Sequence, residues 1–378
     1  MKIRYVIIIL LSISIGWIFI LRNQVFTYPS AEEINERLNY LNRVISEPIE
    51  KGTEIRQIKY RSSEFLLFTY AFSSYAATNI AIHDTAYKHI AVRIIKECIT
   101  KAMDYDVFST YGIQKVDLSM DTLPDFSVLY FGHLNLMIGC YRLLTSDTLF
   151  NNINEKISNS LIERYNKSQF LNLESYKSCI WIPDNTVAIA SLKLFSVNAH
   201  NSCDTICDKW TKYTKLHYID KNTGVLFSTI SNETGAPSEE PRGSMLGWSI
   251  MFIYQFDSEF AIEQFENYKE HFSKDFLIFR LFKERYKNNE SSDGDIDSGP
   301  IYFGYSIPAN EFALGNAILA GDNKTARRIE RLINFGAKKV KGHNEIKYKL
   351  RFIKMNISPM AEALVLNSLT ITKWIDIK

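Results

Sequence analysis

The chain has 378 residues, of which 46% are apolar and 23% are charged, and its formal net charge is +2. This apolar content excludes an intrinsically disordered chain. The near balance of 44 Lys and Arg against 42 Asp and Glu argues against a broad basic face, so we expect no nucleic-acid partner. Aromatic residues reach 13%, and such side chains fill wide cores and line pockets for sugars or terpenes.

The N-terminal segment has the properties of a membrane span. Residues 5–21 (YVIIILLSISIGWIFIL) carry no charge, Lys2 and Arg4 precede them, and Arg22 follows. At about 1.5 Å per residue they cover roughly 25 Å, enough for a bilayer core. A cleaved signal peptide is the alternative, although it favours a shorter apolar region. We interpret residues 1–26 as an uncleaved signal anchor. The flanking charges then place the soluble domain on the periplasmic or extracytoplasmic side.

From residue 27 to 378 the apolar spacing of three and four recurs in segments separated by short polar turns. Buried, nearly uncharged segments such as 185–199 alternate with amphipathic ones such as 323–335. Six such pairs predict an all-α chain with one (α/α)6 toroid or barrel domain, and an ordinary helical bundle is the alternative. The predicted helices are 31–47, 59–79, 84–105, 126–146, 148–165, 183–199, 203–217, 240–256, 258–273, 299–319, 321–338 and 356–375.

One stretch departs from the helical pattern. Residues 219–235 (IDKNTGVLFSTISNETG) have turn residues on both sides of an alternating β-branched run. They predict a short β-hairpin laid across one mouth of the barrel. Since the loops that lead into inner helices converge on one mouth, polar residues there should share a cavity. Four such segments stand out.

The first segment, residues 130–137 (YFGHLNLM), places His133 and Asn135 in an otherwise apolar inner helix. His133 is either a core histidine or a general acid or base. We assign it as a catalytic candidate. Tyr130 and Asn135 are candidates for substrate binding.

The second segment is residues 181–185 (WIPDN). Proline suits a first helical turn, and an acid there is favoured by the helix dipole, so Asp184 could serve only to begin the helix. The functional interpretation makes Asp184 a catalytic carboxylate in the pocket. Trp181 would then be an apolar wall or a surface on which a sugar stacks, and Asn185 would bind substrate.

The third segment, residues 239–248 (EEPRGSMLGW), begins a helix that soon becomes apolar. Glu240 and Arg242 could form an ion pair that shapes the site, or Arg242 could hold an anionic substrate group. We take Glu240 as a catalytic candidate. Arg242 and Ser244 are candidates for substrate binding.

The fourth segment, residues 293–302 (DGDIDSGPIY), has alternating aspartates. It fails the EF-hand pattern, which needs Gly and Glu where Ser298 and Gly304 stand. The segment is either a solvated acidic loop or the source of a second carboxylate. Glycoside cleavage requires paired carboxylates. We take Asp297 as catalytic and Asp295 and Tyr302 as substrate-binding candidates.

Metal and nucleotide motifs are missing from the sequence. Neither CxxC nor a paired HxxxH occurs, and there is no GxGxxG motif or P-loop, so we expect no metal and no cofactor. Among five cysteines, Cys203 and Cys207 would share a helix face and could form a disulfide in an oxidising compartment.

The same segments resemble a known family. They are GHLNLM at 132–137 with Tyr141, Leu143 and Thr145, PDN at 183–185 with Ser191 and Leu192, ETG at 233–235, Trp248, the Asp-rich loop before Gly299, and 358–369. In order and spacing they resemble linalool dehydratase/isomerase, a bacterial terpene enzyme, and the toroid proteins named after it. The resemblance implies an (α/α)6 barrel and metal-independent acid–base hydration and dehydration of a small alkenol. It also implies a catalytic role for His133.

The sequence departs from that family at several catalytic positions. The family's two cysteines correspond to Trp181 and Ala190, and Cys179 is displaced by two residues. A family tyrosine corresponds to Ser244. The family's Asp and Tyr near the first helix have no counterpart in residues 41–50, where only Glu47 and Glu50 are acidic. The substrate implied is therefore a molecule other than linalool, in a more polar pocket.

Three functions fit these observations. The first is a membrane-anchored lyase, hydratase or isomerase of the linalool dehydratase/isomerase type, with His133 as base and Asp184 or a first-helix glutamate as acid. The second is a glycan-active hydrolase, lyase or epimerase that uses pocket carboxylates. The third is a non-catalytic binding or assembly module, in which Asp184→Asn would leave the cellular role intact. The expected partners are a small-molecule or glycan substrate, the membrane and, for an oligomer, further copies of the chain.

Overall fold

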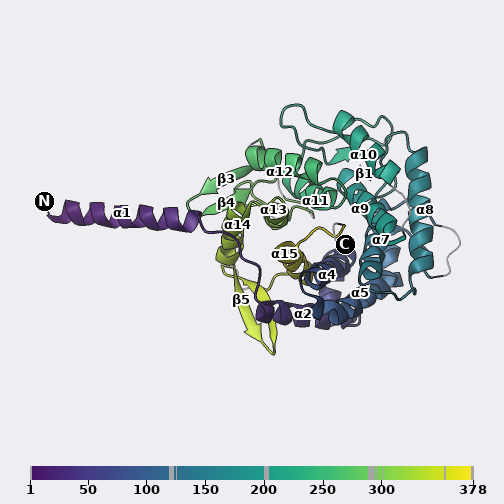
Figure 1. Ribbon diagram of the computed structural model, residues 1–378, viewed down its shortest axis with the longest axis horizontal. Coiled ribbons are helices and arrows are strands. Elements are labelled where there is room, and N and C mark those ends of the chain that lie inside the picture. The colour runs from purple at the N-terminus through teal and green to yellow at the C-terminus, as the bar shows by residue number, and fades with distance from the viewer. Residues whose placement is uncertain are drawn as a thin grey trace.

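The computed structural model describes residues 2–118, 123–124, 126–199, 204–287, 294–295, 297–299, 301–352 and 355–375. Within them, six nearly uncharged helices pack side by side into a closed inner ring (Figure 1). Each helix of the ring contacts the next, and the last contacts the first. In ring order they are α4 (Glu64–His83), α7 (Val128–Leu144), α9 (Ile182–Ala199), α11 (Gly243–Ile253), α13 (Ile307–Leu319) and α15 (Pro359–Thr370).

Amphipathic helices surround this ring, as expected for segments with one charged face. They are α2 (Ala31–Ser46), α5 (Lys88–Ala102), α8 (Asn151–Lys167), α10 (Asp204–His217), α12 (Ser258–Phe272) and α14 (Asn323–Gly336). The twelve helices and the all-α barrel architecture are thus confirmed. Shorter pieces lie between them: α3 (Glu54–Arg61), the 3₁₀ turn Thr85–Tyr87, α6 (Tyr105–Phe108) and the 3₁₀ turn Ser109–Tyr111.

Some helix boundaries differ from the predicted ones. The segment predicted as helix 299–319 becomes helical only at Ile307, where Ser306 accepts a hydrogen bond from the Ala309 N–H and Pro308 occupies the first turn. The residues ahead of Ser306 instead form turns and an isolated β-bridge between Tyr302 and Tyr305. This non-helical stretch allows the acidic loop to reach the barrel mouth.

The described part of the chain also contains three two-stranded antiparallel sheets. β1 (Ile180–Trp181) pairs with β2 (Thr229–Ile230) in the register Ile180 to Ile230 and Trp181 to Thr229. The strand predicted within residues 219–235 is present as β2. It pairs with β1, which lies outside that segment, so the predicted hairpin is not formed by this segment alone. Sequence analysis missed two hairpins: β3 (Ser273–Phe276) with β4 (Phe279–Phe282), and β5 (Ala337–Gly342) with β6 (Glu345–Leu350).

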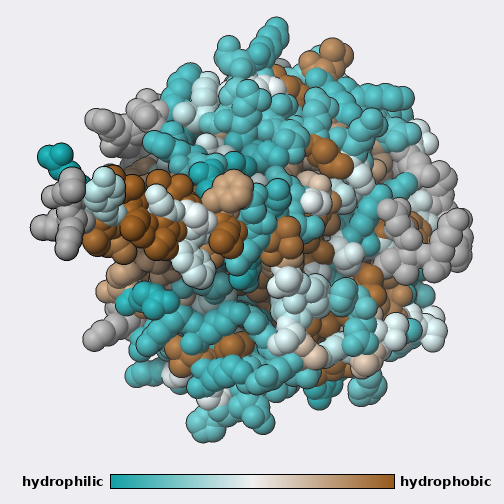
Figure 2. Space-filling model, turned by 60° about the vertical axis from the view of Figure 1, so that its left-hand side comes forward, coloured by the Kyte–Doolittle hydropathy of each residue, from teal (hydrophilic) through white to brown (hydrophobic). Residues whose placement is uncertain are grey.

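Helix α1 (Lys2–Arg22) projects away from the barrel (Figure 1). With this side turned forward, Figure 2 shows its brown apolar side chains gathered at the left of the molecule. Among the described residues, α1 and α4 are both long and apolar enough to cross a membrane, but α4 is buried as an inner barrel helix. The end of α1 is held to the barrel, since Arg331 Nη1 donates to the Leu21 carbonyl at 2.6 Å.

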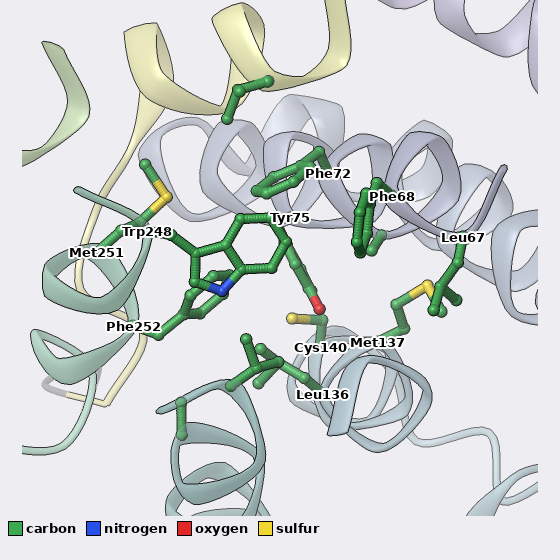
Figure 3. Packing of buried hydrophobic residues seen from close by; sticks show 14 of the residues in the cluster. Leu67, Phe68, Phe72, Tyr75, Leu136, Met137, Cys140, Trp248, Met251 and Phe252 are labelled. Carbon is green, nitrogen blue, oxygen red and sulfur yellow. The ribbon is translucent and has the colours of Figure 1, made fainter. Parts of the chain in front are cut away.

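The core lies inside the inner ring and is rich in aromatic side chains (Figure 3). Trp248 and Phe252 of α11 point toward Phe72 and Tyr75 of α4. The Phe72 and Trp248 rings meet edge to face with centroids 5.4 Å apart, and Phe68 adds a second such contact with Trp248 at 5.2 Å. This geometry is favourable for aromatic pairs. It closes the barrel below the cavity described next.

Candidate functional site

A cavity of about 1010 Å³ opens at the N-terminal ends of the inner helices. All six inner helices contribute to its lining, and the loop that precedes α13 adds Asp297, Gly299, Tyr302, Phe303, Tyr305 and Ser306. The cavity floor is formed by Phe68, Phe72 and Trp248. The convergence of inner-helix starts on one mouth agrees with the expectation from the helix pairs.

Asp184 reaches this cavity from the first turn of α9 and is almost completely buried. Burial raises the pKa of its carboxyl to about 8, and the nearby charges of Asp297 and Glu64 act in the same direction. A hydrogen bond from Ser175 opposes the shift. Asp184 is therefore mainly protonated at neutral pH and can donate a proton.

Asp297 reaches the same cavity from the loop ahead of α13. Burial raises the pKa of Asp297 to about 6; the positive charge of Arg242 opposes that rise and the charge of Asp295 adds to it. Asp297 is therefore mainly ionised at pH 7, while Asp184 is mainly protonated. Two carboxyls in one cavity thus hold different protonation states, which is the arrangement that separates an acid from a base.

An ion-pair network holds the loop that carries Asp297; its Arg242 and Glu284 are buried and its Asp295 is exposed. Arg242 Nε donates to Glu284 Oε1 at 3.0 Å, and its Nη2 donates to Asp295 Oδ1 at 2.8 Å. Asp295 Oδ1 also accepts from the backbone N–H of Ser298 at 2.9 Å and of Asp297 at 3.1 Å. Burial alone would raise the pKa of Asp295, but its bonds from Arg242 and Ser298 lower it to about 2. Arg242 and Asp295 lie outside the cavity lining and position the loop.

Glu284 is the centre of this network, and sequence analysis missed it. Its carboxylate accepts hydrogen bonds from the hydroxyls of Ser244 and Ser306, each at 2.7 Å. Ser306 is the N-cap of α13, and Ser244 stands in the first turn of α11. A single buried carboxylate therefore fixes the starts of two neighbouring inner helices and, through Arg242, the acidic loop.

Two more acids line the cavity and were not predicted. Glu64 stands in the first turn of α4, close enough to Asp184 to affect its pKa. Glu311 lies in α13, where burial raises the pKa of its carboxyl to about 8 and the nearby charge of Glu362 adds to the shift. Each is the only acid in a nearly uncharged inner helix. That lone charge is the signal that could have identified them.

His133 does not line the cavity. It is fully buried below the floor, where the Phe68 and Trp248 rings lie 5.6 and 5.4 Å from its ring. Its Nδ1 shares a 2.9 Å hydrogen bond with the Tyr75 hydroxyl, and its Nε2 has no partner among the described residues. Burial lowers the pKa of His133 to about 3, so the ring is neutral. This position matches the core-histidine interpretation, and the catalytic role of His133 stays a prediction.

The other predicted residues fall into two groups. Trp181, Ser244 and Tyr302 line the cavity, as do Asp184 and Asp297. The remainder lie elsewhere with structural partners: Tyr130 donates to the Ala102 carbonyl, Asn135 bonds Ser158 and Ser191, Asn185 bonds Tyr165 and Leu173, and Glu240 pairs with Lys287 on the surface.

The expected absence of a metal and the possible Cys203–Cys207 disulfide both stay predictions. Among the described residues, no group of three or more His, Cys, Asp or Glu side chains is placed to hold a metal ion. Cys203 lies outside the described residues, so its pairing with Cys207 stays a prediction. Glu47 also takes a structural role: it accepts the backbone N–H groups that begin α3.

No protein-family model matches this sequence. Solved structures of similar shape include a glycoside hydrolase of family 105 from C. acetobutylicum, with a TM-score of 0.56 and 10% identity over 80% of this chain and 92% of the other. The Lin0763 protein from Listeria innocua has a TM-score of 0.56 and 10% identity over 90% and 95% of the two chains. An inactive α-1,6-mannanase variant of family GH76 from Salegentibacter sp., in complex with α-1,6-mannotetrose, has a TM-score of 0.53 and 10% identity over 90% and 99%.

At this level of identity the likeness establishes the fold. These proteins and the present chain share a helical toroid over most of their lengths. No linalool dehydratase/isomerase structure is among the neighbours described, and no model of that family matches, so that resemblance stays a prediction. The chain is an α/α barrel with an acid-bearing cavity at one mouth.

Proposed function

We propose that this protein is a glycan-active enzyme that cleaves a glycosidic bond by acid–base catalysis in the barrel cavity. The observation that carries the proposal is the pair Asp184 and Asp297, one buried and one partly buried carboxyl in one cavity, with pKa values of about 8 and about 6. Proteins that divide acid and base roles between two carboxyls separate their pKa values in this way.

In the proposed reaction, the protonated Asp184 gives its proton to the glycosidic oxygen as the bond to the leaving sugar breaks. The ionised Asp297 acts on the opposite face of the sugar. It either removes a proton from the attacking water or attacks the anomeric carbon itself. Carboxyl separations of about 6.5–9.5 Å favour the first course and about 5–5.5 Å the second. Trp181 and Tyr302, both at the cavity wall, offer flat surfaces on which sugar rings can stack.

The structural neighbours support a glycan substrate. One is described as a glycoside hydrolase, and another was solved with a mannose oligosaccharide bound. The inactive mannanase variant has two consecutive aspartates replaced. No two aspartates are consecutive in the present sequence, so the proposal relies on this chain's own acids.

The test is the release of reducing ends from a panel of neutral and uronic-acid oligosaccharides by the full chain in detergent. Asp184→Asn and Asp297→Asn should each lower kcat about 10²- to 10⁴-fold, the usual contribution of a positioned acid or base. Glu240→Gln is the matched control, because Glu240 is an acid on the surface that pairs with Lys287. Equal activity in all four proteins would overturn the assignment.

A second candidate is lyase, hydratase or isomerase chemistry on an apolar alkenol, with Asp184 as the acid. The observation in its favour is that most of the cavity lining is apolar. Product analysis with a panel of monoterpene alcohols would test it. Turnover of a terpenol, lost in Asp184→Asn, would replace the glycan proposal. If no substrate is turned over and Asp184→Asn leaves the cellular role intact, the binding-module hypothesis is correct.

We further propose that residues 1–26 anchor the protein and that the barrel, residues 27–378, lies on the extracytoplasmic side. The support is the exposed, uncharged surface of α1 and its basic flanks. Extraction of membranes with alkaline carbonate should leave the full chain in the pellet. Protease added to the extracytoplasmic face should degrade the barrel; recovery of the barrel in the soluble fraction at its shortened mass would instead indicate a cleaved signal.

A further inference from the structure

One wall of the cavity is mainly apolar. It runs from the end of α14 through β6 and the segment after it into α15, and Asn356 and Ser358 interrupt it. Among its described residues no acid lines the cavity; the nearest lining acid in the ring is Glu311 on neighbouring α13. Its side chains include Leu332, Phe335, Phe352, Met355, Ile357 and Leu364. A bare glycan can stack its sugar rings on aromatic side chains, but it has no group that needs the aliphatic part of this wall, because sugar hydroxyls lose hydrogen bonds against hydrocarbon.

This apolar wall continues from the cavity onto the protein surface. Phe303 is 98% exposed, Phe352 72% and Phe335 51%, yet all three also line the cavity. The Phe335 ring lies 5.8 Å from that of Phe352, so the two form one surface. Large apolar side chains that are both exposed and contiguous mark a binding surface for another apolar body.

The exposed end of the wall lies on the side of the barrel where α1 attaches. Helix α14 contacts both α1 and the cavity. Its Arg331 donates a hydrogen bond to the Leu21 carbonyl at the end of α1, and the next residue, Leu332, lines the cavity. Arg22 also pairs with Asp275 of β3 at 2.7 Å. Figure 1 shows α1 leaving the molecule beside α14 and the β3–β4 hairpin. The turn of that hairpin exposes two more apolar side chains, Phe276 and Leu277.

Asp184 and the apolar wall lie on opposite sides of the cavity. In the ring order, α9, which carries Asp184, is three helices from α15 in either direction and therefore faces it across the barrel. The cavity is thus amphiphilic, with the proposed acid on one side and hydrocarbon on the other. Its volume of about 1010 Å³ is at the top of the range of roughly 300–1,000 Å³ for common ligand pockets.

We propose that the substrate is a glycan carried on a long hydrocarbon chain, isoprenoid or acyl, which resides in the membrane to which α1 anchors the enzyme. The chain enters over Phe303, Phe335 and Phe352 and lies against the apolar wall. The sugar that it carries reaches Asp184 and Asp297. This inference rests on the proposed glycan-cleaving function and adds the class of substrate and its route of entry.

The test uses the full chain in phospholipid nanodiscs and one oligosaccharide in three forms: free, with an octyl chain, and with a C15 isoprenoid chain. Each methylene transferred from water to an apolar site favours binding up to about fourfold. We expect kcat/KM to rise at least 100-fold from the free sugar to the C15 form. The same series made with a straight C15 acyl chain shows which of the two hydrocarbon types fits better.

Partition of the chain-bearing substrate into the nanodisc would raise kcat/KM for any anchored enzyme, so a variant must separate the two effects. The double variant Phe335→Ser, Phe352→Ser should lower the ratio of C15 to free-sugar kcat/KM at least tenfold. Leu216→Ser is the matched control, since Leu216 is 78% exposed on α10, away from the cavity. The control should keep the ratio of the unsubstituted protein, and unchanged melting temperatures would show that both variants fold.

Failure of this inference is distinguishable from failure of the proposed function. Equal kcat/KM for all three forms, or an unchanged ratio in the double variant, overturns the lipid-linked substrate and leaves glycan cleavage standing. No cleavage of any form overturns the function itself. In that case the quenching of tryptophan fluorescence measures binding, and tighter binding of the free isoprenol than of the C15 glycan overturns the inference as well.

Discussion

Arg242 Nη2 donates a 2.8 Å hydrogen bond to Asp295 Oδ1, and this contact joins the start of α11 to the loop that carries Asp297. The guanidinium also binds the buried Glu284. The position of a proposed catalytic carboxylate therefore depends on an ion pair that does not itself touch the cavity.

Replacement of Arg242 by methionine should destabilise the protein and change its pH dependence. The substitution removes one partner of a buried ion pair and leaves Glu284 without its cation, a change that typically reduces the free energy of unfolding by about 3–5 kcal/mol. Loss of the positive charge should also raise the pKa of Asp297, so the acidic limb of the activity profile should move to higher pH. Urea unfolding and a pH–rate profile measure the two effects. Lys287→Met, which breaks only a surface pair, should change neither.

The unsubstituted enzyme should show a bell-shaped dependence of kcat/KM on pH. Activity should rise with pH as Asp297 ionises near 6 and fall as Asp184 loses its proton near 8. Because the two groups interact, the observed values belong to the pair. Asp184→Asn should abolish the alkaline limb in the residual activity. An alkaline limb that persists in this variant would assign the acid to another group.

Glu311→Gln should stabilise the protein more at pH 8 than at pH 5. The pKa of Glu311 is raised in the folded protein to about 8, so folding is favoured while the carboxyl is protonated. The stability that the protonated Glu311 carboxyl contributes is fully present below the pKa that Glu311 has in the unfolded chain, and it is lost as pH rises through about 8. The amide has no proton to lose. The difference between the two pH values should reach at least about 1.4 kcal/mol, the equivalent of one pKa unit. A gain independent of pH would contradict the buried, protonated state.

His133→Phe should reduce stability without altering the pH–rate profile. The substitution leaves the buried Tyr75 hydroxyl without its partner, which should reduce the free energy of unfolding by about 1–3 kcal/mol. The double variant with Tyr75→Phe should recover part of that loss. Loss of a limb of the pH–rate profile in His133→Phe, with the fold intact, would instead support the acid–base role that the family resemblance implies.

Gly243→Ala tests the junction between α11 and the segment that bears Glu284. A Cβ atom on Gly243 would lie 2.0 Å from the Lys283 carbonyl oxygen, and the Gly243 N–H donates to the Glu284 carbonyl at 2.8 Å. The two backbones must separate, so we expect a loss of at least about 1–3 kcal/mol in urea unfolding. Gly336→Ala is the control, because no atom lies within 4 Å of its added Cβ. A similar urea midpoint for both variants would show that the two backbone segments can move apart at this junction without loss of stability.

The helical barrel could be predicted because its signal is repeated along the chain. Inner helices such as α11 carry no charged residue and outer helices such as α14 carry several, and this contrast depends only on local spacing. The β3–β4 and β5–β6 hairpins escaped prediction because each follows directly on the end of a helix. Their sequences are rich in charge, as in AKKVKG at 337–342, where the pattern resembles a solvated loop.

Two local signals predicted residues that line the cavity. A polar residue at a helix start indicated Asp184 and Ser244, and the run of alternating aspartates indicated Asp297. Asn135 and Asn185 have the same local appearance but turn toward neighbouring helices, a difference set by rotation about the helix axis. Glu284 was missed because it lies in an irregular segment, and only long-range pairing with Arg242 shows its role.

The inner ring is closed by its last member. Helix α15 packs beside α4, and Asn79 Nδ2 donates to Asn367 Oδ1 at 2.9 Å across 288 positions of sequence. Trp374 Nε1 then donates to Asn79 Oδ1 at 2.6 Å. During synthesis α4 is the first inner helix to emerge, and its final neighbour α15 is made only after the other inner helices. Contacts so distant in sequence form slowly, and an open ring exposes hydrocarbon to other chains. A nascent chain of this protein therefore exposes the inner face of α4 until α15 has left the ribosome.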